Sequence, residues 1–123
     1  MRIRNLRTGV AAPPPLRTTD LLVLTVLADG PQHGYGIAQE IGARTRGHLR
    51  IRPGDLYRVL YRMDRAGLIE PATESSRRRE NDERRVNYRI TPLGRRVARA
   101  QATLLAEICA GLLRGAAPSG GVL

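Results

Sequence analysis

The chain has 123 residues and a formal net charge of +10, from 21 basic and 11 acidic residues with both histidines neutral. All the basic residues are arginines, and there are four tyrosines, one cysteine and no tryptophan or phenylalanine. One cysteine excludes an intrachain disulfide framework, and no apolar run approaches the roughly 20 residues that a membrane-spanning helix needs. The length indicates one small domain. A pI near 11.4 makes polyanions the first partners to consider: DNA, RNA or an anionic membrane surface.

The two ends of the chain differ in composition from its middle. Residues 1–17 carry four arginines, and Pro13, Pro14 and Pro15 exclude a helix there. We therefore expect a basic, Pro-rich flexible tail. Residues 115–123 are rich in glycine and alanine and are expected to form a second flexible tail.

Three helices are predicted in the first half of the remaining chain. The first is apolar nearly all round, which is typical of a helix buried on more than one side, and either Thr19 or Asp20 is suited to cap it. The alternating residues His48–Arg52 predict one short strand before the third helix. The predicted helices are Asp20–Ala28, Gly34–Arg44 and Pro53 to about Gly67.

After the third helix the hydrophobic period changes from helical to alternating. Leu68–Glu70 and Asn87–Thr91 indicate two strands of a hairpin. The polar segment between them, Thr73–Arg85, carries five arginines. We call the two strands and this basic loop the wing.

One long helix is predicted to close the fold, from Pro92 to about Arg114, with Thr91 as its cap. Its apolar residues recur at spacings of three and four, which gives one stripe longer than a small domain can cover. We therefore expect this helix to pair with the first helix of a second chain. The expected dimer interface comprises Leu21, Leu24, Val97, Leu104, Leu105, Ile108 and Leu112.

Three helices, a strand, a basic loop, a strand and a helix follow one another in the order of a winged helix-turn-helix. The sequence therefore predicts a mainly α-helical protein with a small β-hairpin. Residues 18–91 would form the winged helix-turn-helix domain and residues 92–114 the dimerisation helix.

Three blocks of the sequence also resemble the PadR family of bacterial transcriptional regulators. Gly30–Ile37 is similar to the family's G-P-x-H-G-Y-x-I, and Arg84–Gly94 to its basic run followed by Y-x-I-T-x-x-G. Pro53–Leu60, followed by Gly67–Ile69, is similar to P-G-T-L-Y-P-A-L with a later G-L-I. The resemblance implies a cytoplasmic, nucleoid-associated repressor that binds a palindromic operator as a homodimer. Only one helix is predicted after the wing, and in this respect the chain resembles the family's shorter subgroup.

The distribution of charge points to nucleic acid independently of the family. Between Arg44 and Arg99, 16 arginines stand against seven acidic residues, a net charge of +9. Arginine suits this task because its planar fork can grip a phosphate or a guanine edge with two hydrogen bonds. The third helix is predicted to face the groove of double-stranded DNA, and the wing to touch phosphates or the minor groove. The candidate residues are Tyr57, Arg58, Tyr61, Arg62 and Arg65 in the helix, and Arg77, Arg78, Arg79, Arg84 and Arg85 in the wing.

Two alternatives stay open at this point. The chain could be an RNA- or ribosome-associated basic winged helix, although few aromatic residues are available for stacking bases. It could also be a protein-interaction adaptor, because Asp55 stands where the family commonly has threonine and would repel a phosphate. The same carboxylate suits the positive end of a helix dipole.

No enzyme, metal site or cofactor is predicted. His48 and Cys109 lack further ligands at useful spacing, and no catalytic triad or phosphate-binding glycine loop is present in the sequence. We expect His33 to make a local helix-cap contact and Tyr35 to lie in the core. A small-molecule effector is left open, and no membrane contact is needed to account for the charge.

Overall fold

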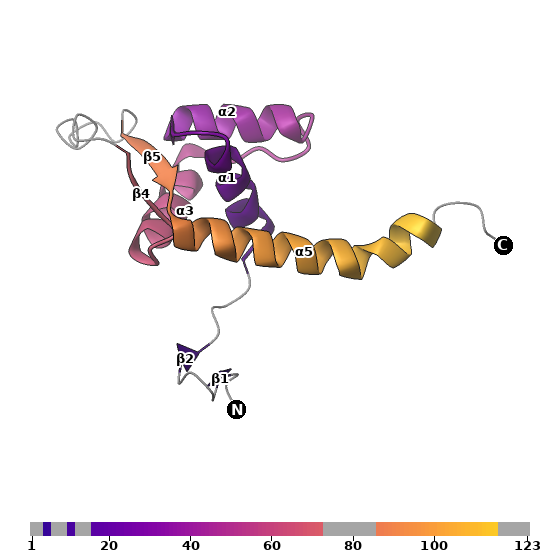
Figure 1. Ribbon diagram of the computed structural model, residues 1–123. Helices are drawn as coiled ribbons and strands as arrows, with labels where there is room; N and C mark the ends of the chain where they lie inside the picture. Colours follow the sequence, from indigo (N-terminus) through magenta and orange to yellow (C-terminus); the bar gives the residue numbers. More distant parts are fainter. Residues whose placement is uncertain (1–3, 6–9, 12–15, 73–85, 116–123) are drawn as a thin grey trace.

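The computed structural model describes residues 4–5, 10–11, 16–72 and 86–115. We call α1, α2, α3 and the three-stranded sheet the head, and α5 begins beside this head and projects away from it (Figure 1). The elements in chain order are β1 (Arg4–Asn5), β2 (Val10–Ala11), α1 (Thr18–Ala28), β3 (Gln32–His33), α2 (Gly34–Arg44), α3 (Pro53–Arg65), β4 (Ile69–Pro71), β5 (Asn87–Ile90) and α5 (Pro92–Gly115).

Helix α1 lies at the centre of the head, as its apolar surface predicts. It packs against α2, α3, β5 and α5, so no single stripe faces inward. Most of its apolar side chains are buried, and α2 and α3 each contribute one stripe to the same core. The buried hydrophobic side chains of the three helices are Val23, Leu24, Val26, Leu27, Ile37, Ile41, Leu56, Val59, Leu60 and Met63.

The predicted strand at His48–Arg52 is wrong. The Thr45 hydroxyl oxygen accepts a hydrogen bond from the Leu49 backbone N–H at 3.0 Å and donates to the Ile41 carbonyl at 2.8 Å. Arg46 and Gly47 have φ angles of 55° and 78°, a left-handed conformation that reverses the chain. A turn closed by Thr45 therefore replaces the strand.

The sheet has one strand more than the predicted hairpin. Its order is β3-β5-β4, with all neighbours antiparallel. In the wing, Ile69 pairs with Ile90 and Pro71 with Tyr88. The added strand pairs Gln32 with Tyr88, and its two residues are too few to show an alternating pattern.

Within the region expected to be a tail, β1 pairs with β2 in a two-stranded antiparallel ladder. Two strands of two residues each carry no periodic signal in the sequence. In the part of the chain that the structure describes, no helix combines the length and the apolar character needed to cross a bilayer.

Two contacts explain residues in the sequence blocks singled out above. His33 caps α2, as expected, because its Nδ1 accepts a hydrogen bond from the Gly36 N–H at 3.0 Å. Tyr35 is 62% exposed rather than in the core, and its hydroxyl oxygen accepts a hydrogen bond from Gln39. The prediction for Tyr35 was wrong because the inward face of α2 is set by Ile37 and Ile41.

The junction between the wing and α5 depends on Thr91 and Gly94. The Thr91 hydroxyl donates to the Gly67 carbonyl at 2.6 Å and accepts from the Gly94 N–H at 2.9 Å, which confirms Thr91 as the cap. A Cβ atom on Gly94 would lie 2.1 Å from the Leu68 carbonyl oxygen. Only glycine lets the first turn of α5 approach the head this closely.

Candidate nucleic-acid interface

The outer face of α3 carries three of the predicted groove residues. Arg58, Tyr61 and Arg65 are spaced three and four apart, opposite the buried stripe of the same helix. All three are exposed, Tyr61 by 64%. Arg65 donates to the Tyr61 hydroxyl at 3.1 Å, and its guanidinium lies 5.5 Å from the ring centroid. This face presents two arginine forks and one aromatic ring to solvent.

Asp55 does not stand as an isolated negative charge at the start of α3. Its carboxylate forms an ion pair with Arg58 and a second one with Arg52, whose Nε lies 3.5 Å from Oδ2. Two cations therefore surround it, and it also lies in the first turn, where the helix dipole favours an anion. This geometry removes the main argument for the adaptor alternative.

Arg62 lies on the flank of α3 that faces α1. Its Nη2 lies 2.5 Å from Oδ1 of Asp20, a buried carboxylate on α1. The Arg62 side chain is nevertheless 44% exposed. Arg62 is therefore an exposed residue tied to α1 by an ion pair, whereas helical spacing predicts a groove-facing residue without such a partner.

Tyr57 is also tied to the head. It is partly buried and packs against the core, and its ring atoms would lie 3.0–3.2 Å from a Cβ on Gly34. Gly34 is the first residue of α2, so the ring fills the space that this glycine leaves. Tyr57 thus joins α2 to α3, whereas the prediction placed it towards the groove.

The five predicted wing arginines, Arg77, Arg78, Arg79, Arg84 and Arg85, lie outside the described residues. The strands that lead to them are well fixed. Arg89 on β5 pairs with Glu70 on β4 at 2.8 Å and donates to the Ala72 carbonyl at 3.1 Å. The Ala72 N–H donates to the Asn87 carbonyl at 2.8 Å, so the strands stay paired where the loop begins.

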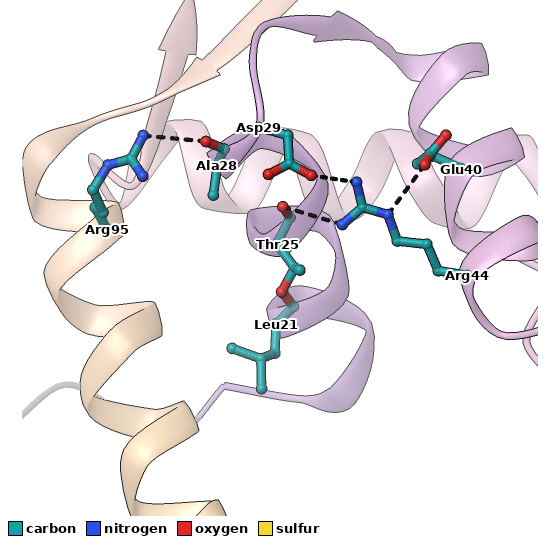
Figure 2. Close-up of polar contacts among 7 residues, drawn as sticks. All are labelled: Leu21, Thr25, Ala28, Asp29, Glu40, Arg44 and Arg95. Atoms are coloured by element: carbon teal, nitrogen blue, oxygen red, sulfur yellow. Dashed lines mark hydrogen bonds and ion pairs between the residues drawn. The ribbon is translucent and has the colours of Figure 1, made fainter.

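Two further arginines act within the fold at the end of α1 (Figure 2). Arg44 lies 2.5 Å from Asp29 and 3.1 Å from Glu40, and these hydrogen bonds raise the pKa of its guanidinium above the usual value. Arg44 also donates to the Thr25 carbonyl, and Arg95 of α5 donates to the Ala28 carbonyl, both at 3.5 Å. These cations stabilise the C-terminal end of α1, so part of the regional charge is structural.

Other arginines were not singled out in the sequence. Arg50 and Arg17 line a cleft of about 470 Å³ on the Arg62 flank of α3, together with Arg58. Among the described residues, neither Arg50 nor Arg46 has a carboxylate partner. The only sequence signal of Arg46 and Arg50 is their charge, because the turn after α2 that positions them was not predicted. On the described chain, no group of three His, Cys, Asp or Glu side chains is placed to hold a metal ion.

The residues expected at a dimer interface fall into three groups by exposure. Leu104, Leu105, Ile108 and Leu112 are between 41% and 78% exposed along α5. Val97 is half-buried against the head, and Leu21 is half-buried on α1. Leu24 is 0% exposed in the core of its own chain, so its assignment to an interface is wrong. Because α1 is apolar nearly all round, the sequence does not tell which of its leucines face inward.

Comparison with known proteins adds an independent result. Residues 23–100 match the model of the "Transcriptional regulator PadR-like family". The transcriptional regulator Rv3488 of Mycobacterium tuberculosis is 33% identical over 101 residues, which cover 82% of this chain and 88% of that protein. An uncharacterized 37.1 kDa protein in transposon TN4556 of Streptomyces fradiae is 36% identical over 105 residues. These cover 84% of this chain, but only 28% of the Streptomyces protein.

Solved structures show the same fold. A transcriptional regulator from Clostridium thermocellum superimposes with a TM-score of 0.62 at 24% identity, over 81% of this chain and 90% of that one. A PadR family transcriptional regulator from Eggerthella lenta gives a TM-score of 0.60 at 25% identity, over 83% and 84% of the two chains. The winged-helix fold is therefore shared with these two proteins.

Proposed function

Because the chain belongs to the PadR-like family of transcriptional regulators, we propose that it binds duplex DNA as a homodimer and represses transcription from a palindromic operator. Members of this family regulate transcription and are not enzymes. In this proposal α3 lies in the major groove and the wing contacts the backbone or the minor groove. The protein would act in the cytoplasm, at the nucleoid.

The outer face of α3 is the observation that carries the proposal. Arg58 and Arg65 are exposed on the side of α3 that faces away from the core, with Tyr61 between them. Arginine is suited to guanine, since its fork donates to O6 and N7 together. Arg58 keeps further N–H donors while one of them holds Asp55.

The exposed apolar stripe of α5 supports the proposed homodimer. Four large residues, Leu104, Leu105, Ile108 and Leu112, remain exposed on one helix, and burying apolar surface stabilises association by about 25 cal/mol per Å². Two heads related by a two-fold axis would address half-sites about 34 Å apart. A dimer seated on such a site excludes other proteins from that DNA, which is the basis for proposing repression.

An effector of the stacked aromatic type does not form part of the proposal. The chain has no tryptophan or phenylalanine, and its four tyrosines lie outside α5. The sequence and the structure therefore offer no aromatic pair on the helix that would form the interface.

Fluorescence anisotropy tests the proposal with a DNA duplex taken from the region upstream of the gene that encodes this chain, called the upstream duplex. The competitors are a scrambled duplex and an RNA of the same sequence, each measured at several salt concentrations. We expect the upstream duplex to bind about 10³-fold more tightly than the scrambled one, and each neutralised phosphate to add about −0.9 to the salt slope. Equal affinity for both duplexes would contradict the proposal. Preference for RNA would support the RNA-associated alternative, and no binding to either nucleic acid would support the adaptor alternative.

Variants of α3 connect the binding to the proposed face. Arg65→Ala should lower affinity for the upstream duplex about tenfold or more if it reads a base. Arg114→Ala, which removes the same charge from the far end of α5, is the matched control and should change affinity little. Equal losses for both variants would show that only the overall charge matters.

A further inference from the structure

The segment just before α1 is attached to α5 through a side-chain amide. The Leu16 N–H donates to Oε1 of Gln101 at 2.8 Å, and Nε2 of Gln101 donates to the Leu16 carbonyl at 2.8 Å. Gln101 thus satisfies both backbone polar groups of one residue that lies 85 positions away in sequence. Two hydrogen bonds in this arrangement fix both the position and the direction of the segment.

The next residue of the same segment is attached to Asp20. The Arg17 N–H donates to Oδ2 of Asp20 at 3.0 Å. The other carboxylate oxygen, Oδ1, accepts a hydrogen bond from Nη2 of Arg62 at 2.5 Å. Asp20 is only 6% exposed, and a buried carboxylate must be paired to be tolerated. Its two oxygens therefore bind one group from the segment and one from α3.

These contacts form one continuous polar path between two helices. It runs from Gln101 on α5, through the Leu16–Arg17 backbone and Asp20, to Arg62 on α3. We call this path the polar relay. Apolar packing between α1 and its neighbours is non-directional, whereas every contact in the relay specifies a direction.

We propose that Gln101 and Asp20 are positioning residues, which act through the polar relay to fix Arg62 relative to α5 for its contact with DNA. The inference rests on the proposed function, in which α5 carries the two-fold axis and α3 reads the operator. Arg62 retains N–H donors beyond the one on Asp20, and its side chain is 44% exposed. Its distance from the two-fold axis would then depend on a hydrogen-bonded connection as well as on packing.

A double-mutant cycle measures whether Gln101 acts through Arg62. Gln101→Ala, Arg62→Ala and the double variant are titrated with the upstream duplex by fluorescence anisotropy. Arg62→Ala should weaken binding about tenfold if it contacts a base. Gln101→Ala should weaken binding about threefold in the wild-type background and leave it unchanged in the Arg62→Ala background. This non-additive result would show that the two residues are coupled, because uncoupled residues give the same loss in both backgrounds.

The Gln101→Ala variant should fold. Gln101 is half-buried, and in the Gln101→Ala variant water can solvate the Leu16 backbone. Arg62→Ala leaves the buried Asp20 carboxylate with the Arg17 N–H as its described partner, so far-UV circular dichroism must first show that this variant and the double variant are folded. Thr103→Ala, at an exposed position of the same helix, is the matched control and should leave affinity unchanged. Equal losses from Gln101→Ala with and without Arg62, or no loss from Arg62→Ala, would overturn the proposal.

A second readout does not depend on DNA. In the free protein, Gln101→Ala and Asp20→Asn should each accelerate hydrogen exchange of the Arg17 amide and shift the Arg62 Nε–H resonance, while Thr103→Ala should change neither. Unchanged signals in Gln101→Ala would overturn the relay even if the protein binds its operator. If the wild-type protein binds no DNA, the proposed function and the positioning role both fail, and the same signals still report whether the path exists.

Discussion

The two halves of α5 differ in what surrounds them. In the proximal half, residues 92–101, Gly94 is buried against Leu68, Val97 and Ala98 pack on the core, and Gln101 bonds to Leu16. The distal half, residues 102–115, carries large apolar side chains that are up to 78% exposed. The same helix therefore packs on the head at one end, and at the other end its apolar side chains meet no partner among the residues that the structure describes.

This difference shows which part of the chain is stabilised by contacts within a single chain. The head buries its apolar residues within one chain, whereas the stripe from Leu104 to Leu112 stays exposed and is not covered by the described part of the chain. Exposed apolar patches of this kind mark interaction sites. Changes in the proximal half should therefore affect folding, and changes in the distal half should affect association.

The largest effect is expected from Ile108→Asp in the distal half. Two symmetric copies of this side chain would leave the interface, each worth about 1.5–3 kcal/mol of burial. The dimer dissociation constant should rise by about 10²–10⁴-fold, as measured by sedimentation equilibrium. Far-UV circular dichroism should show that the head stays folded.

Thr103→Asp is the control for that variant. Thr103 is exposed, and it lies five positions before Ile108, which places it on a different side of the helix. It should leave the dimer intact. Dissociation by Thr103→Asp, or a dimer that survives Ile108→Asp, would show that the distal stripe is not the interface.

A substitution in the proximal half should act on stability instead. Gly94→Ala places a Cβ atom 2.1 Å from the Leu68 carbonyl oxygen, and relieving such a clash should lower the free energy of unfolding by about 1–3 kcal/mol. Gly42→Ala in α2, where a Cβ meets nothing within 4 Å, should raise it by about 0.5–1 kcal/mol. Urea unfolding of both variants measures the contrast, and a loss from each would mean that the Gly94 contact is not the cause.

The smallest effects are expected at the arginines that stabilise the end of α1. Arg44→Ala should cost about 1 kcal/mol, because it removes two ion pairs and a hydrogen bond to Thr25. Arg95→Ala, which removes the 3.5 Å contact from α5 to Ala28, should cost less than about 0.5 kcal/mol. Thermal unfolding measures both. A larger loss for Arg95 would mean that the proximal half is held chiefly by this contact.

Most of the fold was predictable from the sequence because its signals are local. Hydrophobic spacing placed the four helices of the described residues, and the change of period after Gly67 located strands β4 and β5. Strand β3 was missed because it has two residues and exists only through pairing with β5. The short strand before α3 was wrongly predicted because Thr45 and two left-handed residues form a turn there.

The candidate site was less predictable, because helical spacing shows which residues face outward but not their long-range partners. Arg58, Tyr61 and Arg65 stand on the expected face. The contact between Arg62 and Asp20 spans 42 positions in the chain, and no periodicity in the sequence indicates it. In α1 the absence of a polar face left Leu24 indistinguishable from Leu21, although only Leu21 retains exposed surface.

The central claim is that two chains pair through α5 and so present two DNA-reading heads. Hydroxyl-radical footprinting on the upstream duplex tests this claim most directly. The wild-type protein should protect two half-sites whose centres lie about 10 base pairs, one helical turn, apart and are related by a two-fold axis. Ile108→Asp should lose this paired protection at the same protein concentration. A single half-site protected by the wild type, or an identical paired footprint from Ile108→Asp, would contradict the account.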